Sequence, residues 1–239
     1  MQENRSVGAV ASSQPDVSEP NPLQGVPPHI LSLLSRLHKE SKAQESALSE
    51  DFKDRTFDEV MRDKFIALDE DKAQFLFQLC RAINAKTVVE DGTSYGVSTI
   101  YLALAVSANV AATGGQGRVI ATEHEPTKAT KSREYWQECG DIVSGVIALR
   151  GGDLRETLKQ DLGDVDLLLL DIWTEMALPT LKLVQPSMRR GAVVIADNTI
   201  GAAEQYRDLL NYMRGTDSGF TNLTLPYSRG LEMSVYLPR

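Results

Sequence analysis

The sequence is poor in the residues that build disulfide scaffolds, zinc sites and basic surfaces. Its 239 residues include 2 cysteines and 3 histidines, and its formal net charge is −8. Cys80 and Cys139 fall within predicted helices and lack close-spaced partners, so the pattern favours buried thiols over a disulfide framework or a zinc site. The negative charge disfavours nucleic acid and anionic membranes as partners, because both bind basic surfaces.

Long apolar runs are also missing. No stretch reaches the roughly 20 apolar residues that a membrane-spanning helix needs. The first residues, Met1 to Arg5, are not followed by the apolar core of a secretory leader. We therefore expect a cytoplasmic protein that acts on a small molecule, as a monomer or a homodimer. With 42% hydrophobic residues, the chain has enough apolar material for one medium-sized domain with a tail.

The composition changes along the chain and predicts three parts. Residues 1–28 hold five of the 10 prolines among Ser, Gln, Glu and Asn, which predicts a disordered tail. Residues 29–68 begin with an amphipathic helix that should dock on the domain or on a partner. Its charged second half, 50–65, fits short helices that either cover a cleft or lie on the surface. Residues 69–239 form the main predicted domain. The apolar positions of the first helix are Ile30, Leu33, Leu34 and Leu37.

From about Asp69, helical and strand patterns alternate regularly. Repeated β/α units imply a parallel sheet with right-handed crossovers. Two runs, 167–170 and 192–196, are apolar throughout, as is typical of strands buried on both faces at the centre of a sheet. The stretches 222–226 and 232–237 flank a short turn and predict an antiparallel hairpin. The predicted helices are 72–84, 97–110, 127–139, 154–160, 175–188 and 201–214, and the predicted strands are 87–90, 118–123, 145–150, 165–171 and 192–197.

Five of the predicted strands run into an acidic residue at or just past their ends. The carboxyl ends of parallel strands gather at one edge of the sheet, where ligands bind in open α/β folds. Carboxylates crowded together repel one another unless cations, hydrogen-bond donors or water lie between them. The pattern therefore predicts a ligand site at this edge. The five acids are Glu90, Glu123, Asp153, Asp171 and Asp197.

A glycine-containing loop follows the first of these strands. Gly92 and Gly96 permit a tight turn and let a ligand approach the backbone, although turn geometry alone is an alternative explanation. Their Gly-x-x-x-Gly spacing is not the dinucleotide fingerprint, and no P-loop lysine follows, so a nicotinamide-dependent dehydrogenase is disfavoured. The loop indicates nucleotide-type binding.

The acids that follow the next two strands could bind the ribose and the base of a nucleoside. Glu123 could accept hydrogen bonds from two ribose hydroxyls, or it could be a solvated strand-end acid. His124 is the histidine next to this position. Asp153 could accept from an exocyclic amine of a base, or it could cap the helix predicted to begin at 154.

Hard oxygen ligands follow the two central strands. Asp171 ends one of them, and Asp197 and Asn198 end the next. Three such donors suit Mg²⁺ with its remaining positions open, although Asp and Asn are also common turn residues. Trp173 could be a core aromatic residue or a wall beside a substrate.

In their order along the chain, these segments resemble the class I S-adenosylmethionine-dependent O-methyltransferases, in particular the catechol and caffeoyl-CoA O-methyltransferase family. The resemblance covers roughly residues 69–239. It implies a Rossmann-like α/β fold with seven strands, mostly parallel with a C-terminal antiparallel hairpin, and helices on both faces. The segments that carry it are Val89-Glu90-Asp91-Gly92-Thr93-Ser94-Tyr95-Gly96-Val97-Ser98, Glu123, Leu170-Asp171-Ile172-Trp173, Ala196-Asp197-Asn198 and Gly230-Leu231-Glu232.

The resemblance also implies S-adenosylmethionine as the methyl donor and a divalent metal, with Mg²⁺ expected. Metal ligands would be Asp171, Asp197 and Asn198, and the candidate catalytic residues are Asp171, Trp173 and Glu232. In this family the counterpart of Trp173 borders donor and substrate, and that of Glu232 contacts the acceptor. The expected donor-binding residues are Glu90, Gly92, Ser94, Tyr95, Ser98, Glu123, His124, Asp153 and Asp171.

Two positions depart from the family pattern. Thr174 stands where the family usually has a lysine that removes the acceptor proton, and Asp91 stands where an apolar residue is common. The leading hypothesis is a Mg²⁺-dependent O-methyltransferase of a catechol-like molecule. One alternative is N-methylation of a small amine, which attacks without losing a proton first. Another is a catalytically impaired, methyltransferase-like binding protein.

Overall fold

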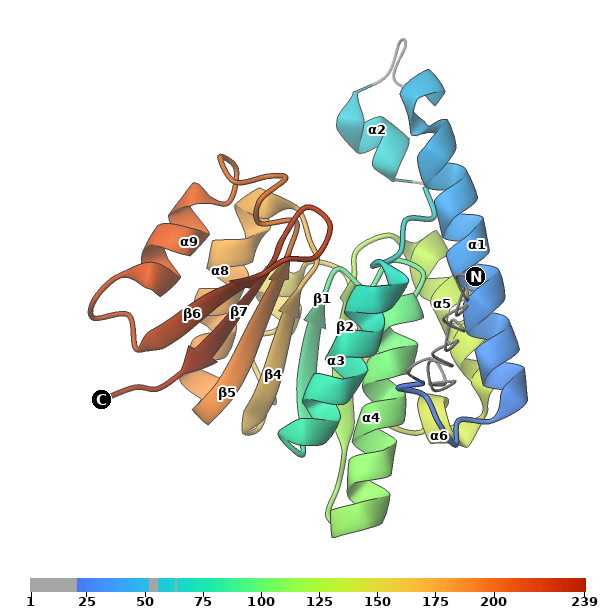
Figure 1. Ribbon diagram of the computed structural model, residues 1–239, viewed down its shortest axis with the longest axis horizontal. Helices are drawn as coiled ribbons and strands as arrows, with labels where there is room; N and C mark the ends of the chain where they lie inside the picture. Colours follow the sequence, from blue (N-terminus) through green and yellow to red (C-terminus); the bar gives the residue numbers. More distant parts are fainter. Residues whose placement is uncertain (1–20, 52–55, 63) are drawn as a thin grey trace, which may run out of the picture.

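The computed structural model describes residues 21–51, 56–62 and 64–239. Within this part, one sheet has the strand order β3-β2-β1-β4-β5-β7-β6. Strands β1 to β5 are parallel, and β7 lies antiparallel between β5 and β6, which confirms the predicted hairpin (Figure 1). The strands are β1 Thr87–Asp91, β2 Arg118–Glu123, β3 Ile147–Gly151, β4 Val165–Leu170, β5 Met188–Asp197, β6 Phe220–Leu225 and β7 Leu231–Tyr236.

Helices cover both faces of the sheet, as predicted for this fold class. On one face, α3 and α4 pack against the sheet, with α1, α5 and α6 beside them. The opposite face carries α7, α8 and α9. The helices are α1 Pro28–Asp51, α2 Phe57–Met61, α3 Glu70–Ala82, α4 Val97–Thr113, α5 Pro126–Cys139, α6 Asp141–Ser144, α7 Leu154–Thr157, α8 Thr174–Val184 and α9 Arg207–Arg214, and a 3₁₀ turn, η1, spans Gln185–Ser187.

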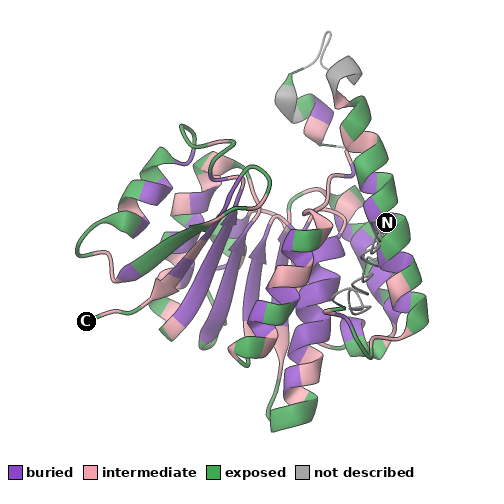
Figure 2. Ribbon diagram, in the orientation of Figure 1, coloured by how far each residue is buried: buried purple, intermediate pink, exposed green. Residues whose placement is uncertain are grey.

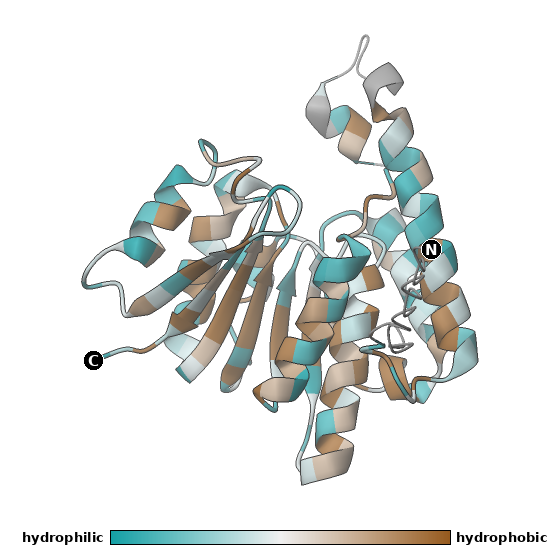
Figure 3. Ribbon diagram, in the orientation of Figure 1, coloured by the Kyte–Doolittle hydropathy of each residue, from teal (hydrophilic) through white to brown (hydrophobic). Residues whose placement is uncertain are grey.

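The apolar central strands supply side chains to both layers. Because successive side chains in a strand point to opposite faces, Leu167 and Leu169 pack with α3 and α4, whereas Leu168 and Leu170 pack with α8. All four side chains are inaccessible to solvent. Figure 2 shows the buried centre of the sheet and Figure 3 its apolar character. The uninterrupted leucine run is therefore a central strand, as the sequence pattern predicts.

All six predicted helices differ from the structure at one or both ends, and two of them differ most. The helix predicted over 201–214 begins only at Arg207, because the N–H groups of Ile200 and Gly201 donate to the carbonyl oxygen of Arg229 in the β6–β7 turn. The helix predicted over 175–188 stops at Val184, and β5 already begins at Met188. Before α9, a contact from the β6–β7 turn decides a boundary that local pattern leaves open.

The N-terminal helix docks on the domain, as predicted, through an apolar stripe that is buried in the core. Residues 1–20 of the predicted disordered tail lie outside the described residues. The described end of that tail is packed, since Leu23 is only 6% exposed and belongs to the same core. The stripe consists of Ile30, Leu33, Leu34 and Leu37.

Cys80 and Cys139 are buried free thiols, which confirms the expectation drawn from their spacing. Among the described residues, none of the helices combines the length and the apolar character that crossing a membrane requires.

Candidate donor and metal site

The sheet register brings the strand-end acids together at the carboxyl edge. Leu170 of β4 pairs with Ala196 of β5, so Asp171 and Asp197 follow side by side. The backbone N–H of Asp171 donates to the carbonyl oxygen of Asp91 at 3.1 Å, which attaches the end of β4 to the end of β1. We call Asp171 and Asp197 the acid pair.

Glu90 organises the loop between β1 and α4 from inside the protein. Its carboxylate is fully buried and accepts hydrogen bonds from the hydroxyls of Ser98 at 2.6 Å, Thr93 at 3.0 Å, and Thr99. Burial raises the pKa of Glu90, and these hydroxyls oppose the shift. The predicted donor-binding residues Glu90 and Ser98 therefore hold one another, and Glu90 fixes the loop that would face the donor.

Glu123 lies at the end of β2 beside the same loop. One carboxylate oxygen accepts from the N–H of Ser94 at 2.7 Å, and the other accepts from the N–H of Glu125 at 2.8 Å. Burial raises the pKa of Glu123, opposed by these two N–H groups and by Lys128. His124 is exposed on the solvent side of this turn. A carboxylate fixed by backbone donors on two sides is well ordered for accepting ribose hydroxyls.

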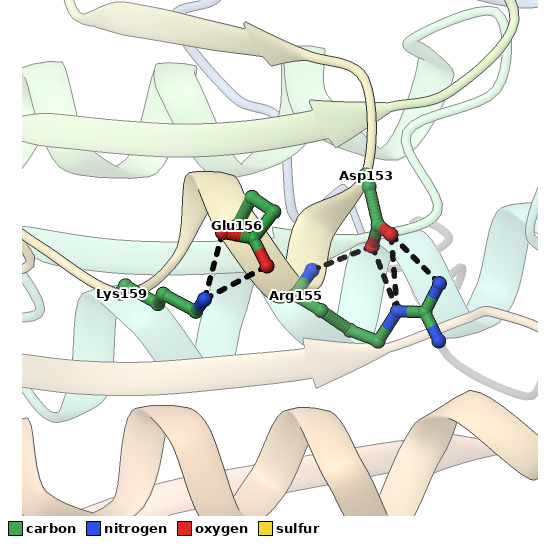
Figure 4. Close-up of polar contacts among 4 residues, drawn as sticks. All are labelled: Asp153, Arg155, Glu156 and Lys159. Carbon is green, nitrogen blue, oxygen red and sulfur yellow. Dashed lines mark hydrogen bonds and ion pairs between the residues drawn. The ribbon is translucent and has the colours of Figure 1, made fainter.

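Asp153 caps α7, which was one of its two predicted roles. Its carboxylate accepts from the backbone N–H of Arg155 at 2.9 Å and from the guanidinium of Arg155, with the shortest contact at 2.7 Å (Figure 4). These hydrogen bonds lower the pKa of Asp153 to about 2. The same side chain is partly exposed at the carboxyl edge, so its predicted contact with a base remains a prediction.

A small cavity lies between the glycine loop and the chain segment before α3. Residues 65–68 line one side of it, and Gly92, Ser94, Tyr95, Ser98 and Asp171 line the other. Phe65 meets Tyr95 edge to face, with ring centroids 4.6 Å apart. Five predicted donor-binding residues thus line the same small cavity.

The predicted metal ligands form a second cluster next to this cavity. The side-chain nitrogen of Asn198 donates to Asp197 Oδ2 at 3.0 Å. Burial and the neighbouring Asp197 carboxylate raise the pKa of Asp171 above its usual range. Burial also raises the pKa of Asp197, but Lys72 opposes the shift. Two carboxylates that disfavour each other's ionisation would gain from a shared cation.

The donor set fits a hard divalent ion by its chemistry, because it offers two carboxylates and an amide oxygen. Within the described residues, no group of three or more His, Cys, Asp and Glu side chains is arranged to hold a metal ion. The amide of Asn198 is therefore essential to the predicted set. Metal binding by Asp171, Asp197 and Asn198 remains a prediction.

Trp173 lies two residues after Asp171, at the start of α8. It precedes the first residue of α8 and is 42% exposed, so it is a surface aromatic and not a core residue. The next residue, Thr174, donates from its hydroxyl to the carboxylate of Glu175 at 3.2 Å. This surface position suits a wall beside a substrate, which is one of the two roles predicted for the tryptophan.

Glu232 is set apart from the acid pair. Leu231 packs on the face of the sheet that carries α3, so Glu232 points to the opposite face, toward α9. Its buried carboxylate accepts from Arg214 at 2.9 and 2.8 Å and from Thr224 at 2.5 Å. This placement does not favour the predicted acceptor contact, because Arg214 and Thr224 hold the side chain on the face of the sheet opposite to α3.

Sequence reasoning missed Lys72. Its side chain is 1% exposed, and its ammonium lies 2.7 Å from Asp197 Oδ1. The sequence contains a signal for this residue, because Lys72, Leu76 and Cys80 lie on one buried face of the helix. A lysine on such a face must be paired with an acid, since burying an unpaired charge is costly. The cavity-lining segment 65–68 was also missed, since no periodicity marks it.

Asp91 lies on the other side of β1 from Glu90, toward α8. Its Oδ1 accepts from the hydroxyl of Thr122 at 3.0 Å. Burial raises the pKa of Asp91 to about 7, although the hydroxyls of Thr180 and Thr122 oppose this. A neutral, protonated Asp91 explains how two adjacent acids can be buried at the end of one strand.

This protonation predicts a pH-dependent stability. Above about pH 4 the unfolded state has lost the Asp91 proton, whereas the native state keeps it until about pH 7. Stability therefore falls as the pH rises through this window, by about 1.4 kcal/mol per pH unit. We expect Asp91→Asn, compared with wild type, to gain about 3 kcal/mol between pH 5 and pH 8 in chemical unfolding followed by circular dichroism. Asp164→Asn, at an exposed acid, is the control. An effect of Asp91→Asn that did not change with pH would contradict a protonated Asp91.

Sequence comparisons agree with this architecture. Residues 89–199 match the family model of a methyltransferase domain. Catechol O-methyltransferase from Mycobacterium tuberculosis is 34% identical over 136 residues, which are 56% of this chain and 58% of that protein. The chain thus spans less than two thirds of the length of this curated relative.

Solved structures with the same fold extend over nearly the whole chain. Cofactor-bound Rv0187 from MTB has a TM-score of 0.67 and 26% identity, covering 93% of this chain and 100% of the other. The O-methyltransferase TomG from Streptomyces achromogenes, in complex with SAM, has a TM-score of 0.63 at 20% identity over 86% of this chain and 89% of the other, and this likeness concerns the fold alone. These matches confirm the expected resemblance to the class I S-adenosylmethionine-dependent O-methyltransferases, and residues 89–199 are similar to a methyltransferase domain.

Proposed function

We propose that this protein transfers a methyl group from S-adenosylmethionine to a hydroxyl of a small, chelating, catechol-like acceptor, with the help of Mg²⁺. The observation that carries the proposal is the position of the acid pair. Asp171 lines the cavity beside the glycine loop, and the sheet register sets Asp197 next to it. A donor bound along the glycine loop and a chelated acceptor at the acid pair would therefore be neighbours.

When bound, S-adenosylmethionine would supply an electrophilic methyl group, and Mg²⁺ would supply a Lewis acid that lowers the pKa of an acceptor hydroxyl. The protein's own residues mainly position the reactants, which suits an in-line displacement. Glu123 and the loop held by Glu90 would orient the donor. Trp173 would wall the acceptor, and Asp171, Asp197 and Asn198 would hold the cation.

Thr174 supports a second candidate, the methylation of a small amine. A threonine hydroxyl cannot act as a base at neutral pH, and this one donates to Glu175. A neutral amine needs no base before it attacks, so the loss of the family lysine would matter less. The third possibility, a protein that binds the donor without turnover, is favoured by the same residue.

Isothermal calorimetry separates these possibilities. S-adenosylmethionine is titrated with and without Mg²⁺, and a catechol is then added to the same samples. We expect donor binding in both cases and acceptor binding only with Mg²⁺. Donor binding without any effect of the metal on the acceptor would favour the amine or the non-catalytic alternative. Absence of donor binding would overturn the proposal. Mass spectrometry and NMR of the product distinguish O-methylation from N-methylation.

Glu123→Gln should weaken donor binding. The substitution removes the charge of a carboxylate that two backbone N–H groups hold in place. Hydrogen bonds to charged groups contribute about 1.5–3 kcal/mol, so we expect the donor Kd to rise about 10- to 100-fold in the same calorimetry. The matched control is Glu125→Gln, two residues further along the turn, which should bind the donor like wild type. Equal affinities for Glu123→Gln and wild type would assign the ribose to another residue.

A further inference from the structure

Lys72 is a buried cation in the first turn of α3. Its side chain is 1% exposed, which is rare for lysine because an ammonium loses its hydration on burial. Such a charge persists only where it is paired and hydrogen-bonded. The residues that contact the ammonium therefore indicate the role of Lys72.

Two carboxylates hold the ammonium. Asp197 Oδ1 lies 2.7 Å from Nζ, and Asp69 Oδ2 lies 3.0 Å away. The side chain of Asp197 is 6% exposed, whereas that of Asp69 is 42% exposed. The buried contact is thus the one with Asp197, and it joins the start of α3 to the end of β5.

This contact is an ion pair, since Asp197 Oδ1 accepts no hydrogen bond from the described residues, and it holds one side of the carboxylate. Its Oδ1 faces Lys72, and its Oδ2 accepts from the amide of Asn198 at 3.0 Å. The carboxylate of Asp197 therefore lies between the ammonium of Lys72 and the side-chain amide of Asn198.

We propose that Lys72 is a positioning residue, whose ammonium fixes Asp197 so that Oδ2 and Asn198 face the same point as Asp171. The inference rests on the proposed metal site and adds a residue outside the ligand set. Groups that contact metal-ligating carboxylates from outside the ligand set orient them, and removing such a group typically lowers metal affinity 10- to 100-fold.

Mn²⁺ binding measured by electron paramagnetic resonance tests this role without requiring turnover. We expect Lys72→Met to bind Mn²⁺ about 10- to 100-fold more weakly than wild type, and Lys72→Arg, which keeps the charge, to recover part of the loss. Lys86→Met is the matched control, because that lysine contacts the carbonyl oxygen of Gly114 near the amino-terminal edge of the sheet. Tyr101→Phe, a buried change at the contact with His38, controls for lost stability alone. Both controls should bind Mn²⁺ like wild type.

The outcomes separate the two proposals. Wild-type protein that does not bind Mn²⁺, even with donor present, would overturn the proposed metal dependence and with it the role of Lys72. Wild-type binding with equal or tighter binding by folded Lys72→Met would overturn only the role of Lys72. If Lys72→Met loses its native circular dichroism spectrum, the Asp69→Asn variant tests the role of Lys72 instead. This substitution removes the exposed carboxylate that contacts the ammonium and leaves Lys72 in place.

For Asp69→Asn we expect Mn²⁺ affinity to fall at least threefold. Glu70→Gln is its control, since it removes a charge from the same turn, and that carboxylate accepts from Gln74. Unchanged affinity in Asp69→Asn, or an equal fall in both variants, would contradict the positioning role.

Discussion

Asp171→Ala is expected to lower kcat/KM for a catechol-type acceptor by about 1,000-fold, which corresponds to about 4 kcal/mol of transition-state stabilisation. The substitution removes one carboxylate of the acid pair and, at the same time, one of the side chains that line the small cavity beside the glycine loop. It therefore affects both the cation that would activate the acceptor and the alignment of the two reactants. Steady-state kinetics with saturating Mg²⁺ and donor give the ratio.

The matched control for this prediction is Asp164→Ala. Asp164 is an exposed acid just before β4, at the opposite end of the strand that leads to Asp171. Its removal changes the net charge equally but leaves the site intact, so we expect wild-type kinetics. Sustained turnover by wild type that Asp171→Ala abolishes would also exclude the non-catalytic alternative. Turnover that survives in Asp171→Ala would mean that the acid pair does not bind the acceptor.

Gly92→Ala is expected to cost about 3 kcal/mol or more of folding stability, or to prevent folding. Gly92 has φ of +85°, and a β-carbon there would lie 2.9 Å from the carbonyl carbon of Asp171 and closer still to its oxygen. The added β-carbon belongs to the segment after β1, and the atoms that it would meet belong to the backbone after β4. Neither segment can move away without disturbing the sheet. Thermal unfolding followed by circular dichroism should show a fall in Tm of about 6–12 °C for a domain of this size.

Gly114→Ala separates the two causes of this loss. Gly114 also has a positive φ, +71°, but a β-carbon there would meet nothing within 4 Å. Only the conformational strain remains, because φ of 71° with ψ of −172° is a backbone conformation that is essentially restricted to glycine, and it costs about 1–3 kcal/mol. A Gly92→Ala variant no less stable than Gly114→Ala would show that the close approach of β1 and β4 is not needed for folding.

The fold was predictable because its signals are local and repeated. Strand 118–123 was predicted with the same bounds as β2, and the Leu167–Leu170 run identified a central strand from its apolar character alone. The acids at the strand ends were predictable for the same reason, since a parallel sheet brings all its carboxyl ends to one edge. The start of α9 was missed because a backbone contact with Arg229, distant in sequence, replaces the expected first turns.

The roles of individual acids needed the tertiary structure. Glu90, Asp91 and Glu232 are all acidic residues at strand ends, yet the first holds a loop, the second is buried under α8 and the third pairs with Arg214. The spacing of these residues in the sequence does not distinguish their three roles. The separation comes from which face of the sheet each side chain meets and which helix covers that face.

Sequence pattern alone was thus sufficient for the class of fold, for the resemblance to methyltransferases and for the edge of the sheet where the strand-end acids meet, because periodicity and strand-end chemistry are properties of short segments. Only the folded chain reveals that Lys72 reaches Asp197 across 125 positions of sequence, that residues 65–68 close over the glycine loop, and that Glu232 faces away from the acid pair. The physical reason is that the role of a buried charged residue depends on which residues it contacts. In this protein those contacts depend on the packing of α3 on one face of the sheet and of α9 on the other.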